Sequence, residues 1–174
     1  MPRFLLAATL LLLFVLEGTL VQVFLPDKWG LSLMTVPRFA LVGTILVSMF
    51  LGRREGLYYG LALGFLQDVL YGQVIGLYMI TMMVASYFAG LIVLLFQRGF
   101  GMVFITCSLI LFAHEWLLYS LHLLLTKAPV DVQWMLNWQI LPTVVLNMLS
   151  ALVIYSPIKR LCESVMFKRD LPLE

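Results

Sequence analysis

The sequence has few charged residues for its length. Asp, Glu, Lys and Arg make up 11% of its 174 residues, whereas 63% are apolar, and the mean hydropathy is +1.04. The surface of a water-soluble domain needs roughly a quarter of its residues to be charged. The composition therefore excludes a soluble globular domain and predicts an integral membrane protein with nearly all of its mass in the lipid.

Cysteines and catalytic motifs are scarce as well. Cys107 lies in an apolar run and Cys162 in the polar tail, so their spacing predicts free thiols, with no metal site and no disulfide. His114 and Glu115 begin a HExxH pattern, but Leu118 stands where the second zinc-binding histidine belongs. The sequence also lacks a nucleophile elbow and a glycine-rich phosphate loop. We therefore expect no enzyme, no metal and no cofactor.

Long hydrophobic runs are what the sequence has instead. A helix needs about 20 apolar residues to cross about 30 Å of hydrocarbon. Charge, Pro and Gly divide the chain into six runs of this kind, and the sixth contains Pro142 and Pro157. They predict an all-α polytopic membrane protein, a single domain over residues 1–174, with about six transmembrane helices. The runs cover residues 4–25, 31–51, 57–75, 77–96, 102–125 and 135–158.

The basic residues predict the orientation of these spans, because cytoplasmic loops retain Lys and Arg. With the N-terminus inside, eight of the 11 Lys and Arg residues are cytoplasmic, which predicts both termini in the cytoplasm. Trp29, Trp134 and Trp138 then fall at the outer interface, where residues 127–137 form a short interfacial segment. No loop is long enough for a soluble catalytic or nucleic-acid-binding domain, so we expect no nucleic-acid partner. The cytoplasmic residues are Arg3, Arg53, Arg54, Arg98, Lys159, Arg160, Lys168 and Arg169, and the outer ones are Lys28, Arg38 and Lys127.

Glycine recurs at every fourth position around the third run, with one aspartate in the series. The positions are Gly52, Gly56, Gly60, Gly64, Asp68, Gly72 and Gly76. Residues four apart share a helix face, and small residues there let two helices approach closely. The small residues thus form a flat groove on the helix. This groove either packs against another helix of this chain or binds a partner helix. We expect Gly56 and Gly60 to be the partner contact, because Asp68 should turn its end of the stripe inward.

Ionisable side chains in the hydrocarbon form a second group. Each costs roughly 3 kcal/mol to insert, so they usually face the protein interior. At 1.5 Å per residue, Glu17, Asp68 and Glu115 lie roughly 17 to 20 Å from the cytoplasmic ends of their spans. Arg38 enters from outside to a similar depth and should pair with at least one of these acids. Glu115 shares a helix face with His122, which completes a predicted intramembrane polar layer. The layer is either a buried ion pair with hydrogen-bonded neighbours, or a ligand pocket or proton path.

Residues 36–80 resemble the bacterial rod-shape-determining MreD family. In that family a proline opens the second span, and a glycine-rich third span ends in Gly, a few apolar residues, Asp and Gly. Pro37 and the glycine series with Asp68 fit this pattern, and the polar Gln22 late in the first run is similar too. The family often has Asp after the proline, whereas this chain has Arg38, so the resemblance assigns that residue no shared role.

The resemblance implies a non-enzymatic component of the cell-elongation machinery in the bacterial plasma membrane. Its implied partners are MreC, a single-span membrane protein, the MreB filaments, and the glycosyltransferase and transpeptidase that build lateral peptidoglycan. The family is similar in architecture to the substrate-binding subunits of energy-coupling-factor transporters, which gives an alternative function as a small-molecule-binding subunit. Such subunits usually dock through an Ala-xxx-Ala patch, which Ala7 and Ala8 do not provide. A proton-coupled channel or transporter acting alone is a third class, without a repeat pattern to favour it.

Overall fold

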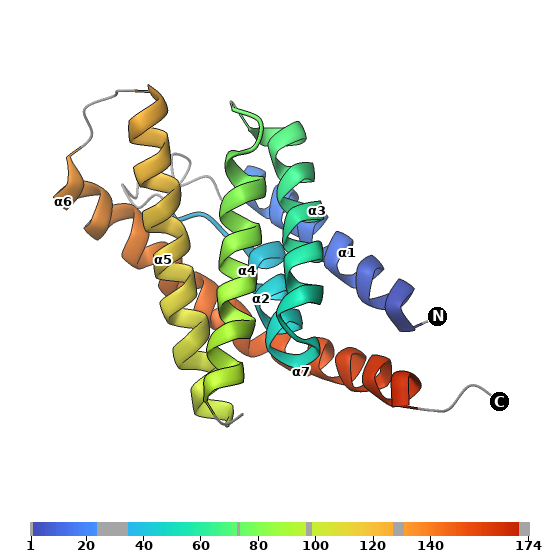
Figure 1. The fold of residues 1–174 in the computed structure, drawn as a ribbon. Helices are drawn as coiled ribbons and strands as arrows, with labels where there is room; N and C mark the ends of the chain where they lie inside the picture. Colours follow the sequence, from blue (N-terminus) through green and yellow to red (C-terminus); the bar gives the residue numbers. More distant parts are fainter. Residues whose placement is uncertain (1, 24–34, 73, 97–98, 127–130, 171–174) are drawn as a thin grey trace.

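The helices form a bundle in a computed structural model that describes residues 2–23, 35–72, 74–96, 99–126 and 131–170. No strand occurs in this part of the chain. In Figure 1, α3, α4 and α5 stand side by side, while α7 crosses the bundle obliquely. The elements are α1 (Pro2–Val23), α2 (Phe39–Leu51), α3 (Arg53–Tyr71), α4 (Leu77–Leu95), α5 (Phe100–Thr126), α6 (Val132–Met135), the π-helix η2 (Leu136–Ile140) and α7 (Leu141–Asp170).

Four helical segments among the described residues are long and apolar enough to cross a membrane. They are Pro2–Thr19, Leu77–Leu95, Phe100–Leu125 and Val132–Lys168. With 13 residues, α2 is about 20 Å long at 1.5 Å per residue, which is short for a bilayer. The 19 residues of α3 include Arg53, Arg54 and Asp68, which lower its hydropathy. The structure thus supports a helical membrane protein, with four such segments where the hydrophobic runs predicted six.

Two predicted boundaries differ most from the structure. The second helix begins at Phe39, because Pro37 lacks an N–H donor and keeps the preceding residue extended; residues 31–34 lie outside the described residues. The last helix continues through Pro157 to Asp170 instead of ending near it.

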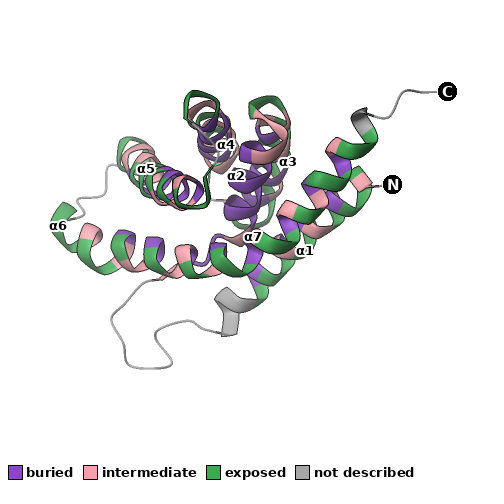
Figure 2. Ribbon diagram, turned by 90° about the horizontal axis from the view of Figure 1, so that it is seen from below, coloured by how far each residue is buried: buried purple, intermediate pink, exposed green. Residues whose placement is uncertain are grey.

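The core of the bundle is α2. Its residues are buried without interruption from Ala40 to Met49, and it contacts α1, α3, α4, α5 and α7. Figure 2 shows this helix as buried among partly exposed neighbours. A helix that is apolar on all sides is typical of such a central position.

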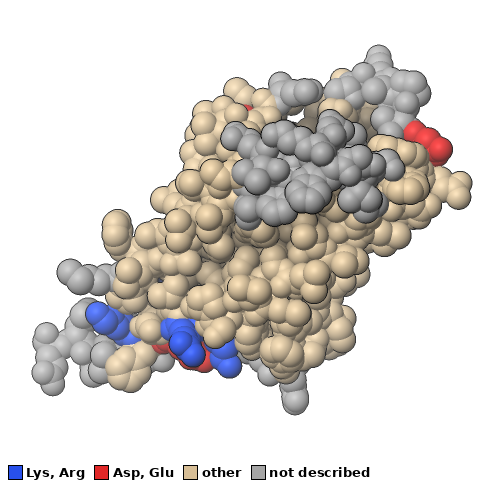
Figure 3. Space-filling model, turned by 180° about the vertical axis from the view of Figure 1, so that it is seen from behind, with Lys and Arg blue, Asp and Glu red and all other residues tan. Residues whose placement is uncertain are grey.

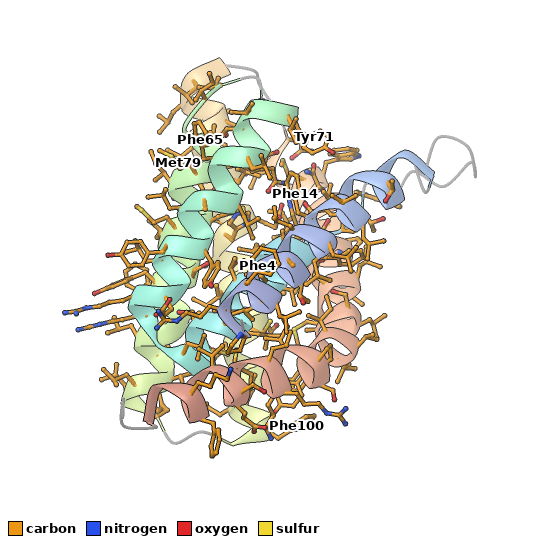
Figure 4. The ribbon with its side chains drawn as sticks, turned by 90° about the vertical axis from the view of Figure 1, so that its right-hand side faces the viewer. Phe4, Phe14, Phe65, Tyr71, Met79 and Phe100 are labelled. Atoms are coloured by element: carbon orange, nitrogen blue, oxygen red, sulfur yellow. The ribbon has the colours of Figure 1, made fainter. Side chains whose placement is uncertain are left out.

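The first helix packs against the C-terminal end of α3. The rings of Phe14 and Tyr71, both labelled in Figure 4, have centroids 6.1 Å apart. Gly18 lies next to the same tyrosine, whose hydroxyl occupies the space that a Cβ would need. Both predicted free thiols, Cys107 and Cys162, are free and buried.

Candidate functional site

The chain is not helical where it approaches the start of α2. Unpaired backbone groups are costly in a bilayer, so non-helical chain inside a bundle needs polar partners. Asn147 of α7 supplies two: its Oδ1 accepts from the Arg38 N–H at 2.7 Å, and its Nδ2 donates to the Val36 carbonyl at 3.0 Å. Thr143, one turn earlier, accepts from the Val36 N–H at 3.2 Å. The side chains of α7 thus complete the backbone hydrogen bonding of the residues before α2.

Glu17 of α1 joins the first turn of α2 from another side. Its Oε2 accepts from the Ala40 N–H at 3.0 Å, and its Oε1 accepts from Gln67 Nε2 of α3 at 3.0 Å. The first amides of a helix have no partner within the helix, and its dipole favours negative charge there. The carboxylate therefore ties α1, α2 and α3 together.

Arg38 pairs with Glu115, as the sequence predicted for at least one acid. Its Nε lies 3.1 Å from Glu115 Oε1, and both side chains are buried. The Arg38 Cζ also lies 5.1 Å from the centre of the Tyr78 ring. Because a buried ion pair must offset the loss of hydration, such added contacts matter. We name Glu17, Arg38, Gln67, Glu115, Thr143 and Asn147 the outer polar centre.

Asp68 has a role that its depth in the membrane did not predict. Its two carboxylate oxygens accept hydrogen bonds at 2.9 Å from the backbone N–H groups of Gly76, Tyr78 and Met79. It therefore caps the N-terminus of α4, where a negative charge is favourable. Tyr78 is one of the residues whose amides bind Asp68. The cap therefore also fixes the backbone that carries the Tyr78 ring, which lies against Arg38.

A cavity of about 500 Å³ lies beside the outer polar centre. Arg38, Glu115 and His122 line it together with the rings of Tyr78 and Trp134. Its volume is in the range of small-molecule sites, which combine apolar and aromatic walls with a few polar groups. Of the predicted polar layer, Arg38, Glu115 and His122 therefore meet at this cavity, while Glu17 and Asp68 act on helix ends.

The glycine stripe packs within the chain. A Cβ on Gly56 would lie 2.8 Å from Ser48 Cα of α2, and one on Gly60 would lie 2.8 Å from the Met82 carbonyl oxygen of α4. A Cβ on Gly64 would meet the α4 backbone in the same way. The expectation that Gly56 and Gly60 contact a partner is therefore wrong, because helices of the same chain occupy that space.

The remaining glycines of the series serve turns. Gly52, between α2 and α3, has a φ of +105°, and Gly76, before α4, has a φ of +104°. These values lie in the region that favours glycine. Gly72 ends α3 and donates its N–H to the Asp68 carbonyl at 3.0 Å. Gly72 and Gly76 flank the predicted tight connection between α3 and α4, in which residue 73 lies outside the described residues.

The family described as "MreD: rod shape-determining protein MreD" matches residues 2–165. The chain belongs to the MreD family of rod-shape-determining membrane proteins. A rod shape-determining protein MreD of Bacillus subtilis (strain 168) is 25% identical over 163 residues, which cover 91% of this chain and 92% of that protein. No solved structure matches the chain. The resemblance first seen in residues 36–80 thus extends along nearly the whole MreD-family chain.

Sequence reasoning missed several residues of the outer polar centre in this MreD-family chain. Gln67, Thr143 and Asn147 are uncharged, and only ionisable residues were taken as candidates. Thr143 and Asn147 nevertheless stand four residues apart in an apolar run, and therefore on one helix face. That pattern would have indicated a polar contact. Gln22 and Trp29 lie where no side chain is described.

Proposed function

We propose that this MreD-family chain is a non-enzymatic component of the cell-elongation machinery that acts through helix–helix contacts with a single-span protein resembling MreC. The family match over residues 2–165 is the observation that carries the proposal. The structure offers a physical reason for a scaffold role. Its buried polar contacts link α1, α2, α3, α4, α5 and α7, so the helices can present a fixed outer surface to partner helices.

The proposal includes six membrane crossings with both termini in the cytoplasm. Arg3 Nη2 lies 3.7 Å from Glu55 Oε1, so α1 and α3 start at the same end of the bundle. The Tyr155 ring lies 5.7 Å from that of Phe50 and 5.3 Å from that of Phe100, which brings the later part of α7 to the end of α2 and the start of α5. Figure 3 shows Lys and Arg side chains gathered at one end of the visible face. The preference of Lys and Arg for the cytoplasm supports the orientation.

The short α2 and the polar α3 complete the six crossings in this proposal. The two helices of the α3–α4 hairpin have 19 residues each, about 28 Å at 1.5 Å per residue. Since α4 is apolar enough to span, its antiparallel neighbour should span with it. The buried polar residues of α3, Gln67 and Asp68, have hydrogen-bond partners inside the bundle, which lowers their cost in lipid.

The proposed partners are an MreC-like single-span protein and, assembled with it, MreB filaments and the elongation glycosyltransferase and transpeptidase. Because the glycine stripe is filled from within, the partner helix should bind a lipid-facing surface. Purification of a tagged chain from native membranes in mild detergent tests the proposal. Recovery of the MreC-like protein, together with rounding of rod-shaped cells on depletion of the chain, is expected. Purification without that protein from cells that stay rod-shaped would contradict it.

A second candidate function rests on the cavity beside the outer polar centre. A substrate-binding subunit, with the proposed energy-coupling-factor-like architecture, needs an outward cavity with aromatic and polar walls, and Arg38, Glu115 and Trp134 line such a cavity. The same purification discriminates the two functions, because recovery of an ATP-hydrolysing module would favour a transporter. Leu118→Trp, which fills the cavity wall, should then abolish retention of any co-purified small molecule. Leu124→Trp, on an exposed position of α5, is the matched control.

A further inference from the structure

The cavity beside the outer polar centre is deep, and its charged groups lie at one end. Glu115, Tyr119 and His122 of α5 line it, and at 1.5 Å per residue these positions span about 10 Å of helix. Arg38 joins Glu115 through the 3.1 Å contact, while His122 stands nearer the C-terminal end of α5. The cavity therefore extends from the buried ion pair toward the helix end that the proposed topology places outside.

The ion pair does not use all of its hydrogen-bonding groups. One hydrogen bond joins the two side chains, from Arg38 Nε to Glu115 Oε1. Apart from Tyr78, no described residue takes a hydrogen bond from the Nη groups of Arg38, and none donates to Glu115 Oε2. These atoms are not sealed within the protein, and both residues line the cavity. The floor of the cavity therefore presents a fork of donors beside an acceptor oxygen.

Aromatic and apolar side chains form the walls above the ion pair. Tyr71, Tyr78 and Trp134 contribute rings, and Leu118 contributes an aliphatic side chain. A cavity of about 500 Å³ with such walls suits a small molecule that carries an apolar or aromatic group. The charged floor would bind the polar end of that molecule.

One wall of the cavity carries an irregular helical turn. The π-helix Leu136–Ile140 lies there, and its Gln139 side chain lines the cavity. In its wide turn the Leu141 N–H donates to the Leu136 carbonyl, five residues back. A single π turn within a helical segment is uncommon and is frequent at functional sites. This observation is independent of the ion pair and indicates the same cavity.

The charge of the floor limits the charge of an occupant. The charges of Arg38 and Glu115 cancel, so a singly charged ligand would leave a net charge buried where it is poorly solvated. A ligand with an anionic acceptor for the guanidinium and a cationic donor for the carboxylate adds no net charge. In an α-amino acid the carboxylate and the ammonium group are one carbon apart, which suits two protein groups that are in contact at 3.1 Å.

We infer that this cavity binds an α-amino acid with an apolar or aromatic side chain. Its carboxylate binds Arg38, its ammonium group binds Glu115, and its side chain lies among the rings of the walls. The inference goes beyond the scaffold function and does not depend on it. It names a ligand class for the cavity on which the second candidate function rests, and it requires binding but no transport.

Thermal unfolding of the purified full-length chain in mild detergent tests the ligand class. L-phenylalanine and L-leucine, each at about 10 mM, should raise the Tm, because a ligand that binds only the folded chain stabilises it. Phenethylamine lacks the carboxylate and 3-phenylpropionate lacks the ammonium group, so both should bind at least about tenfold more weakly than phenylalanine. The concentration dependence of the Tm measures this ratio. No shift with any apolar or aromatic L-amino acid, or equal shifts with the singly charged analogues, would overturn the inference.

A substitution at the floor distinguishes a binding role from a structural one. Glu115→Gln removes the partner of the ammonium group and leaves the charge of Arg38 without compensation. The preference should therefore reverse, with 3-phenylpropionate raising the Tm of this variant more than L-phenylalanine does. A purely structural role of Glu115 would not reverse it. A variant that folds and still prefers phenylalanine would contradict the inference.

A substitution in the wall tests the place of binding and leaves the ion pair intact. Leu118→Trp fills the cavity and should abolish the shift with phenylalanine, whereas Leu124→Trp, at an exposed position of α5, should retain it. An unchanged shift with Leu118→Trp would place the ligand elsewhere and overturn the inference. Neither result depends on recovery of the MreC-like protein, so failure of this inference and failure of the proposed function are distinguishable.

Discussion

At the scale of single residues, Arg38 has two separate tasks. Its backbone N–H is held by Asn147, which shapes the start of α2, while its side chain pairs with Glu115 on α5. The backbone contact does not depend on the side chain, so a substitution at this position removes only the side-chain contacts with Glu115 and Tyr78. Because both partners are buried, removing one leaves the other charged in a medium that solvates it poorly.

Arg38→Leu should lower the free energy of unfolding by about 3–5 kcal/mol, the usual cost of leaving one member of a buried pair. The double variant Arg38→Leu with Glu115→Leu removes both charges and should recover much of that loss. Thermal unfolding in detergent measures both, with Arg160→Leu, at an exposed position, as the control. A double variant no more stable than the single one would show that the pair is not coupled as the structure has it.

Gly60 is limited by the backbone of another helix. Because the Met82 carbonyl oxygen lies 2.8 Å from the place of its Cβ, Gly60→Leu should force α3 and α4 apart. We expect the free energy of unfolding to fall by at least about 1–3 kcal/mol, and the chain to be less abundant in the membrane. Ala62→Leu, two residues away on the exposed face of the same helix, should be inserted and folded normally. Wild-type abundance and thermal stability of Gly60→Leu would contradict the close packing of α3 on α4.

At the scale of elements, the start of α2 depends on helices distant in the sequence. Pro37 ends regular hydrogen bonding there, and Glu17 of α1 and Asn147 of α7 supply the missing partners. The arrangement meets the general condition for non-helical backbone in membranes, which is tolerated where protein groups satisfy it. Asp68 does the same for α4 by accepting hydrogen bonds from the amides of its first turn.

Asn147→Leu should therefore destabilise the chain although it replaces a polar residue with an apolar one in a membrane. It leaves the Arg38 N–H and the Val36 carbonyl without their partner, at about 1–3 kcal/mol for each group. Thermal unfolding in detergent would register the loss. Ser164→Leu is the control, because that hydroxyl is exposed and donates to the Arg160 carbonyl of its own helix. Equal stability of the Asn147→Leu and control variants would show that these backbone groups find other partners.

At the scale of the whole molecule, the ends of the helices sort by charge. The Lys and Arg side chains that the structure describes on α3 lie near the Arg3–Glu55 contact. Those that it describes on α7 follow Tyr155, whose ring lies near the end of α2. Asp131 lies before α6, at the other end of the chain's last helical segment, and Trp134 and Trp138 follow it with exposed rings. Exposed tryptophans at a helix end are typical of the membrane interface.

The proposed six-span topology predicts opposite accessibility for two exposed acidic positions. Asp131→Cys should react with a membrane-impermeant maleimide in intact spheroplasts, whereas Glu163→Cys should react only after permeabilisation. The parent chain is the background control, because Cys107 and Cys162 are buried. Labelling of both introduced cysteines from the same side would show an even number of crossings between positions 131 and 163, where the proposal has one, and would overturn the topology.

A helical membrane protein and the connection between α3 and α4 could be predicted from the sequence, because hydropathy and turn residues act locally along the chain. Glycine spacing likewise predicted a face for close packing. The sequence did not reveal what fills that face, because the choice between α4 and a partner helix depends on how each helix is rotated. The sequence also predicted only the depth of Asp68 in the membrane. The sharp turn before α4 brings its carboxylate to three backbone amides, which the depth does not reveal.

The sequence by itself determined that this is an integral membrane protein, and its motif in residues 36–80 indicated the MreD family. Only the tertiary structure decided which polar groups meet. Arg38 and Asn147 are 109 residues apart, and Arg38 and Glu115 are 77 residues apart, so no local pattern links them. In a bilayer no water can substitute for a missing partner. The fold must therefore bring these distant groups together, and that requirement acts on the packed bundle as a whole.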